Sequence, residues 1–144
     1  MFKSTCCFVV VLLLFVAGCG GEAVPELATV SGTITMNGEP LDQVKVTFMP
    51  DAERGNGGRS SYGETDENGR YTLTYQLPGE PQEGAAVGWH KVCLRDLIPT
   101  RARDEGGQQI PRRISGNYSN APKTPLEFEV KAGDQVIDIT ALPN

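Results

Sequence analysis

The sequence predicts an all-β fold, a sandwich of seven strands behind an N-terminal export signal. From residue 29 onward, apolar and polar side chains alternate with the period of two that half-buried strands show, and no segment carries a helical period. Breaks that contain glycine recur at short intervals, as they do in β-sandwiches. Two sheets packed face to face would bury the apolar side of every strand.

Residues 1–18 are predicted to be an export signal and not a membrane-spanning helix. Lys3 is the only charged residue before Glu22, and residues 8–17 form an unbroken run of ten apolar side chains. A helix that crosses the hydrocarbon core needs about 20 apolar residues, so the run is too short. The run ends in Val16-Ala17-Gly18-Cys19. Small residues directly before a cysteine resemble a bacterial lipobox, and the alternative is an ordinary signal peptide with a chance cysteine.

In the lipobox interpretation, Cys19 is the lipid-bearing first residue of the mature chain. Residues 19–28, with two adjacent glycines and a proline, are then a flexible tether, and residues 29–144 form the folded domain. Several acyl chains would hold the protein to a membrane without a spanning helix. The residues after Cys19 are Gly20 and Gly21, without the aspartate that often retains lipoproteins at the inner membrane, so an outer-membrane location in the cell envelope is favoured.

Charge and cysteine content narrow the function classes. Of the 144 residues, removal of residues 1–18 takes away Lys3 alone among the charged side chains, which leaves 12 basic and 18 acidic residues and a net charge of −6. An acidic protein gains little from a phosphate backbone, so nucleic acid is not an expected partner. Cys93 is the only cysteine after Cys19, so no disulfide within the domain is predicted.

Each expected strand carries alternating apolar side chains. A short third strand is expected over residues 61–66. In the other six strands, in chain order, the side chains expected on one face are Val30, Ile34 and Met36; Val44, Val46 and Phe48; Tyr71, Leu73 and Tyr75; His90, Val92 and Leu94; Leu126, Phe128 and Val130; and Ile137, Ile139 and Ala141. Asn37-Gly38 and the segment 66–69 are predicted to be tight turns, because asparagine and glycine tolerate positive φ. Residues 97–123 are expected to be irregular.

Several of these segments resemble carboxypeptidase regulatory-like domains. The resemblance rests on VSGTITMNGEPLDQVKVTFMP at the start, YGETDENGRYTL at the third and fourth strands, GWHKVCL, and VKAGDQVIDITAL at the end. It implies a Greek-key sandwich of the transthyretin (prealbumin) type, as found in small bacterial lipoproteins. Between Ile110 and Pro125 the sequence departs from the pattern, because Ile110-Pro111 is not followed directly by the expected lysine and tyrosine.

Residue content argues against catalysis. Hydroxyisourate hydrolases of the transthyretin type use several histidines and end in a Tyr-Arg-Gly-Ser tail, and intradiol dioxygenases of related fold bind iron through two histidines and two tyrosines. This chain has one histidine, His90, and ends in Thr-Ala-Leu-Pro-Asn. One histidine and one cysteine in the folded part do not make a zinc site. We therefore expect no enzyme, no cofactor and no metal, with a packed neutral His90.

The candidate ligand contacts are Trp89, Arg112 and Arg113. Trp89 is the only tryptophan, and alternation places it on the face opposite His90. Residues 95–113 hold five arginines against three acidic residues, a local net charge of +2. Such a segment suits anionic lipid headgroups, an acidic envelope polysaccharide or a protein partner, and the alternative is a solvated loop without a ligand. The sequence thus predicts a lipid-anchored accessory, structural or binding module of the envelope. The alternatives are a cell-surface carbohydrate-binding module and, third, a transthyretin-like hydrolase.

Overall fold

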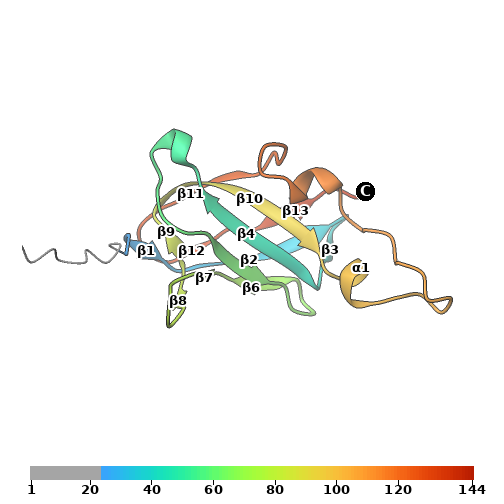
Figure 1. Ribbon diagram of the computed structural model, residues 1–144. Helices are drawn as coiled ribbons and strands as arrows, with labels where there is room; N and C mark the ends of the chain where they lie inside the picture. Colours follow the sequence, from blue (N-terminus) through green and yellow to red (C-terminus); the bar gives the residue numbers. More distant parts are fainter. Residues whose placement is uncertain (1–23) are drawn as a thin grey trace, which may run out of the picture.

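Two long strands form the centre of the larger sheet, β4 (Val44–Pro50) and β10 (Gly88–Asp96), in the computed structural model, which describes residues 24–144 (Figure 1). They pair antiparallel over seven residues, from His90 opposite Pro50 to Asp96 opposite Val44. The strand order in this sheet is β11-β10-β4-β5-β7-β8. The other four strands are β5 (Ser61–Glu64), β7 (Thr74–Tyr75), β8 (Gln82–Glu83) and β11 (Glu127–Val130).

The smaller sheet is organised around β2 (Val30–Met36). Two strands, β12 (Gln135–Val136) and β13 (Ile139–Ala141), pair with β2 in parallel. Two others, β3 (Glu39–Pro40) and β6 (Arg70–Thr72), pair with it antiparallel. A separate two-stranded ladder joins β1 (Leu27–Ala28) to β9 (Ala85–Ala86).

The inward-facing side chains of both sheets meet in one apolar core. Along β4 and β10 the alternation predicted from the sequence is confirmed, because Val44, Val46 and Phe48 are fully buried, as are Val92 and Leu94. The smaller sheet contributes side chains such as Val30, Ile34 and Ile139. The prediction of a β-sandwich-like, all-β fold is confirmed.

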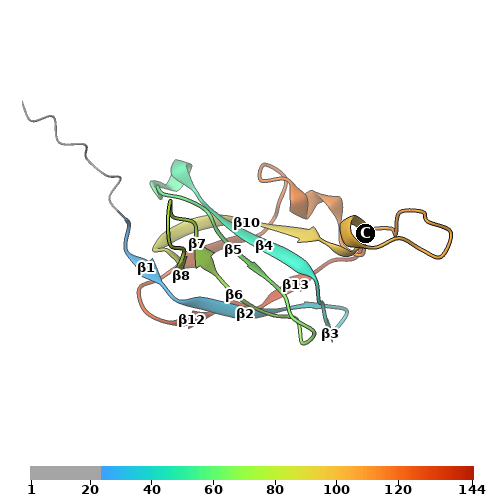
Figure 2. The same cartoon turned by 60° about the horizontal axis from the view of Figure 1, so that its bottom comes forward.

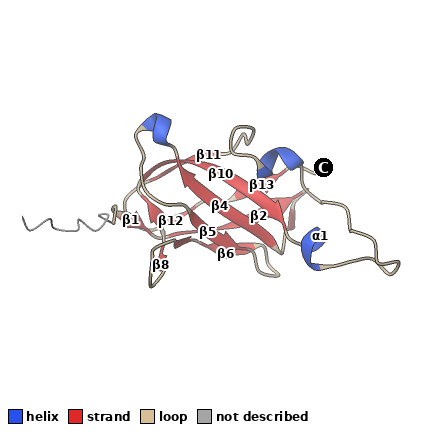
Figure 3. Ribbon diagram, viewed as in Figure 1, coloured by secondary structure: helices blue, strands red, loops and turns tan. Residues whose placement is uncertain are grey.

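Among residues 24–144, helical structure is confined to short turns between strands (Figure 3). A 3-10 turn, η1 (Ala52–Arg54), follows β4. The segment expected to be irregular, 97–123, contains one four-residue helix, α1 (Ile98–Arg101), and a second 3-10 turn, η2 (Gly116–Ser119). Both Ile114 and Tyr118 in this segment are buried, so it packs onto the sandwich.

Two details of the strand connections differ from the sequence prediction. Asn37 and Gly38 have positive φ as expected, but their turn leads into the short β3, and only then does the chain cross to β4 in the other sheet. The expected fourth strand is divided at Leu73. Its first part, β6, pairs with β2, and its second part, β7, pairs with β5, because the chain passes from one sheet to the other at this residue. The expected fourth strand is therefore two shorter strands, one in each sheet.

The ordered domain begins before residue 29. Leu27 and Ala28, at the end of the expected tether, pair with Ala86 and Ala85, and the Ala28 side chain is 3% exposed. This backbone pairing, together with the hydrogen bond from the Val87 N–H to the Glu26 carbonyl, makes the end of the expected tether part of the fold. The predicted signal of residues 1–18 and Cys19 lie outside the described residues.

The two ends of the sandwich are formed by different parts of the chain. Figures 1 and 2 show β1 at one end and the segment after β10, with the C-terminus, at the other. The pairing explains this arrangement, since β1 pairs with β9, β9 lies just before the first residue of β10, and α1 follows just after its last. Any chain that precedes residue 24 therefore enters the domain at the end opposite α1.

Candidate functional site

A cleft of about 740 Å³ lies on the outer face of the larger sheet, beside the segment 97–123. Strand alternation builds its floor: because Val46 and Leu94 point into the core, their neighbours point outward. The floor residues are Lys45, Thr47 and Met49 of β4 with Cys93 and Arg95 of β10. The wall residues include Pro99, Thr100, Gln109, Arg112, Ser119 and Asn120. The volume lies within the ordinary range for small-molecule sites.

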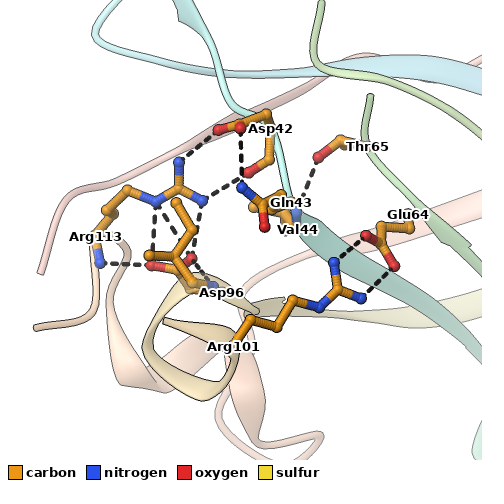
Figure 4. Close-up of polar contacts among 9 residues, drawn as sticks. Asp42, Gln43, Val44, Glu64, Thr65, Asp96, Arg101 and Arg113 are labelled. Atoms are coloured by element: carbon orange, nitrogen blue, oxygen red, sulfur yellow. Dashed lines mark hydrogen bonds and ion pairs between the residues drawn. The ribbon is translucent and has the colours of Figure 1, made fainter. Parts of the chain in front are cut away.

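A partly buried ion-pair network fixes the wall of the cleft to the sandwich (Figure 4). The guanidinium of Arg113 donates hydrogen bonds to both carboxylate oxygens of Asp96 and to Asp42, with Nη2 2.8 Å from Asp96 Oδ1 and Nη1 2.9 Å from Asp42 Oδ1. The backbone N–H of Arg113 also donates to Asp96 Oδ2, at 2.8 Å. Asp96 is the last residue of β10 and its side chain is fully buried. One arginine thus joins 97–123 to β10 and to the loop before β4.

Arg101 makes a second connection between this segment and the sheet. Its two terminal nitrogens donate to the two carboxylate oxygens of Glu64 in β5, at 2.5 and 2.9 Å, in the parallel geometry that suits arginine and carboxylate. Both side chains are nearly half exposed. This pair therefore orients α1 more than it stabilises the fold.

These contacts shift the carboxyl pKa values in a consistent direction. Burial alone would raise the pKa of Asp96, but the hydrogen bonds and charge of Arg113 outweigh it and lower the pKa below its ordinary value. The hydrogen bond from Arg113 also lowers the pKa of Asp42. The hydrogen bond from Arg101 lowers the pKa of Glu64. All three groups are thus held as carboxylates near neutral pH.

Three other cations of the cleft have no carboxylate of their own. Within residues 24–144, Lys45, Arg95 and Arg112 form no ion pair within 4 Å, and all three are exposed. Lys45 and Arg95 are directly opposite each other on β4 and β10. The Lys45 ammonium lies 5.1 Å from the centre of the Tyr62 ring, a contact that leaves its charge in place. The cleft is therefore basic although the protein is acidic.

The structure separates the two candidate arginines. Arg112 is exposed and lines the cleft, and it also lines a smaller neighbouring hollow of about 310 Å³. Arg113 is committed to Asp96 and Asp42, so its guanidinium stabilises the wall of the cleft. The two residues are adjacent in sequence, but their side chains have different roles.

Trp89 lies outside the cleft and is covered by another side chain. The Arg54 guanidinium carbon is 4.2 Å from the centre of the indole ring, and Arg54 is held there by Glu127 at 2.6 Å. Trp89 is half-buried, and its carbonyl accepts hydrogen bonds from Asp51 and Asn56. One face of the ring is therefore occupied by a cation–π contact.

His90 belongs to the core. It is 1% exposed, it contacts Phe48 with 5.8 Å between ring centres, and its Nδ1 donates to the Gly88 carbonyl at 2.9 Å. Its Nε2 has no hydrogen-bond partner among the described residues. Burial lowers the pKa of His90, so the ring is neutral. No described serine or aspartate is hydrogen-bonded to it, and the arrangement offers no activated nucleophile.

The carboxylates that fix the wall of the cleft, Asp42, Glu64 and Asp96, were not among the site residues predicted from the sequence. A signal for Asp96 was present, because it continues the inward-facing alternation of His90, Val92 and Leu94, and a carboxylate at such a position needs a cationic partner. Asp42 and Glu64 carry no comparable signal, since their partners lie 71 and 37 residues away along the chain.

Cys93 lies on the floor of the cleft, and burial raises the pKa of its thiol, so it is a poor nucleophile near neutral pH. Among residues 24–144, no three His, Cys, Asp or Glu side chains are grouped to hold a metal ion. Across the same part of the chain, no helix has the length and apolar character to cross a membrane.

Comparisons of the chain with protein-family models, with curated proteins and with solved structures found no match.

Proposed function

We propose that the chain is a lipid-anchored, non-catalytic module of the cell envelope. The observation that carries this proposal is the order of segments at the N-terminus, in which a short apolar run is followed by Val16-Ala17-Gly18 and then Cys19. That order is suited to cleavage before Cys19 and attachment of lipid to its thiol. An outer-membrane location is part of the proposal.

The shape of the domain supports this function. Leu27, the first residue of β1, is eight residues after Cys19. A fully extended chain of that length spans at most about 30 Å. The anchor would thus hold the β1 end of the sandwich near the membrane. The nine residues of β10 extend about 30 Å away from that end, and the cleft is built around their distal half. The basic cleft would then be directed away from the membrane that holds the anchor.

Assignment to the carboxypeptidase regulatory-like domains, with a Greek-key topology of the transthyretin type, is part of the same proposal. It is supported by the sequence resemblance and by the all-β architecture. A transthyretin-like hydrolase is the weakest alternative, because the one histidine is buried and bonded to a backbone carbonyl. A carbohydrate-binding module that uses Trp89 is disfavoured by Arg54, which covers the ring.

The proposal is tested by fractionation of cells that express the full chain. The unaltered protein is expected in the membrane fraction, and a Cys19→Ser variant in the soluble fraction. A Cys93→Ser variant is the matched control, since it removes a thiol from the folded domain and should stay with the membranes. Recovery of Cys19→Ser in the membrane fraction, in the same amount as the unaltered protein, would overturn the proposal.

A further inference from the structure

The cations of the cleft come from three segments far apart in the sequence. Lys45 lies on β4, Arg95 on β10 and Arg112 in the segment that forms the wall. The antiparallel register places Lys45 and Arg95 directly opposite each other. Like charges at opposed positions of neighbouring strands destabilise a sheet. The fold thus keeps an unfavourable arrangement in the floor of the cleft.

Two carboxylates lie beside these cations and each is engaged by another arginine, although the charge of Lys45 also helps to lower the pKa of Glu64. Glu64 is the cross-strand neighbour of Lys45 on the other side, but Arg101 engages both of its oxygens. Asp96 also borders the cleft, and its carboxylate is saturated by Arg113. The two acidic groups nearest the cations are therefore already paired. An anion bound in the cleft would relieve the repulsion and meet two guanidinium groups, whose planar geometry suits carboxylates.

The remaining polar lining suits a ligand with hydroxyl groups. The side chains of Thr47, Thr100 and Ser119 form no hydrogen bond within the described part of the chain and border the cleft. Gln109 and Asn120 add two neutral amides. A volume of about 740 Å³ is far larger than a simple inorganic anion would need. Several neutral donors and acceptors beside three cations favour an acidic saccharide, with its carboxylates at the cations and its hydroxyls at the neutral groups.

We propose that this cleft binds an acidic saccharide through Lys45, Arg95 and Arg112. The choice of a saccharide over an anionic lipid headgroup rests on the proposed function, because the anchor would place the cleft at the end of the sandwich away from the membrane. Binding itself does not depend on the anchor. The titration described next is therefore separate from the fractionation that tests the anchor.

The test is calorimetric titration of the full chain, purified in neutral detergent, with tri-galacturonate and with its methyl ester as the uncharged match. The acid is expected to bind and the ester to bind at least tenfold more weakly. Arg95→Gln and Arg112→Gln should each weaken binding about tenfold, since each removes one charge-assisted contact. Arg103→Gln is the matched control, because Arg103 is exposed in the same segment but does not line the cleft. It should change affinity less than twofold.

A second measurement locates the ligand without any substitution. Cys93 lies on the cleft floor, so bound tri-galacturonate should slow its alkylation, followed by mass spectrometry of the peptide that contains it. If Arg95→Gln, Arg112→Gln and Arg103→Gln all weakened binding equally, the binding would depend only on net charge and not on the cleft, and the proposal would be overturned. Equal affinity for acid and ester would also overturn it. Binding only to phosphatidylglycerol vesicles or to inorganic phosphate would overturn it in favour of a phosphate ligand.

Discussion

Arg113 determines how the segment 97–123 is held, and through it the shape of the cleft. Its guanidinium lies between Asp96, which is buried, and Asp42, which is partly exposed. A buried carboxylate that loses its arginine keeps its desolvation penalty without compensation. The position tolerates neither a neutral residue nor a shorter donor that fails to reach both aspartates.

Replacement of Arg113 by glutamine should lower the free energy of unfolding by about 2–4 kcal/mol, the upper part of which applies to fully buried pairs. Urea denaturation followed by fluorescence measures the change. Arg112→Gln is the control, because it removes the same charge from the neighbouring residue, whose side chain is exposed. The free energy of unfolding of this variant should change by less than about 0.5 kcal/mol. Similar losses in the free energy of unfolding for the two variants would show that the Asp96–Arg113 contact does not stabilise the fold.

Acid should weaken the protein through the same network. The pKa values of Asp42 and Asp96 in the folded protein lie below their ordinary value of 3.8, so on acidification the unfolded chain takes up these protons first. The stabilisation is complete above that value and is lost as pH falls through the folded pKa values. We expect the urea midpoint to fall between pH 5 and pH 3.

The Arg113→Gln variant tests the cause of this dependence. Without the guanidinium, burial raises the pKa of Asp96, so protonation no longer opposes folding at this residue. The fall between pH 5 and pH 3 should therefore be smaller in the variant than in the unaltered protein. An identical fall in both would assign the acid dependence to other carboxylates.

Sequence reasoning at the level of single residues succeeded where the backbone pattern decides. Alternation along β10 placed His90 inward and Trp89 on the opposite face, and the structure has both as expected. It did not distinguish Arg112 from Arg113, because the distinction depends on Asp96 and Asp42, which only the fold brings to Arg113. It also did not foresee that Arg54 covers Trp89, a contact between residues 35 positions apart.

At the scale of elements, the contact between β2 and the last strand depends on the absence of a side chain at Gly32. A Cβ built there would lie 1.9 Å from the carbonyl oxygen of Ile137, which is far inside van der Waals contact. The interruption between β12 and β13 falls at this point, and Asp138 accepts a hydrogen bond from the backbone N–H of Thr33. The close approach explains why the closing strand is split.

Gly32→Ala should therefore destabilise the domain by about 3 kcal/mol or more, because backbone atoms and not a flexible side chain must move. Gly57→Ala is the matched control: it lies in a loop, has no atom within 4 Å of the added methyl, and does not need a positive φ. Thermal unfolding of both variants makes the comparison. A Gly32→Ala protein as stable as Gly57→Ala would mean that β2 and residues 137–138 are not packed as described.

The main strands could be predicted from sequence because each buries a regular alternating face. The small elements could not. The pairing of β1 with β9 involves two dipeptides, Leu27–Ala28 and Ala85–Ala86, that carry no periodicity of their own. The division of the chain at Leu73 depends on which sheet each half meets, and that is a property of the assembled fold.

At the scale of the whole molecule, the two ends of the domain contain different elements. The chain enters at β1, beside β9 and the start of β10, whereas the cations of the cleft are grouped toward the end where β10 leads into α1. An anchor at Cys19 would turn this difference into an orientation, with one end near the membrane and the other directed away from it. The acidic net charge of the chain could be predicted from its composition. The basic cleft could not, because it depends on the register that places Lys45 of β4 opposite Arg95 of β10.

The most direct test of the central claim is the mass of the N-terminal peptide of the protein purified from membranes. We expect a peptide that begins at Cys19 and carries a diacylglyceryl group on its thiol. The same modification should be present in a Cys93→Ser variant. An unmodified peptide that begins at any other residue would contradict the account and make the chain a secreted domain without an anchor.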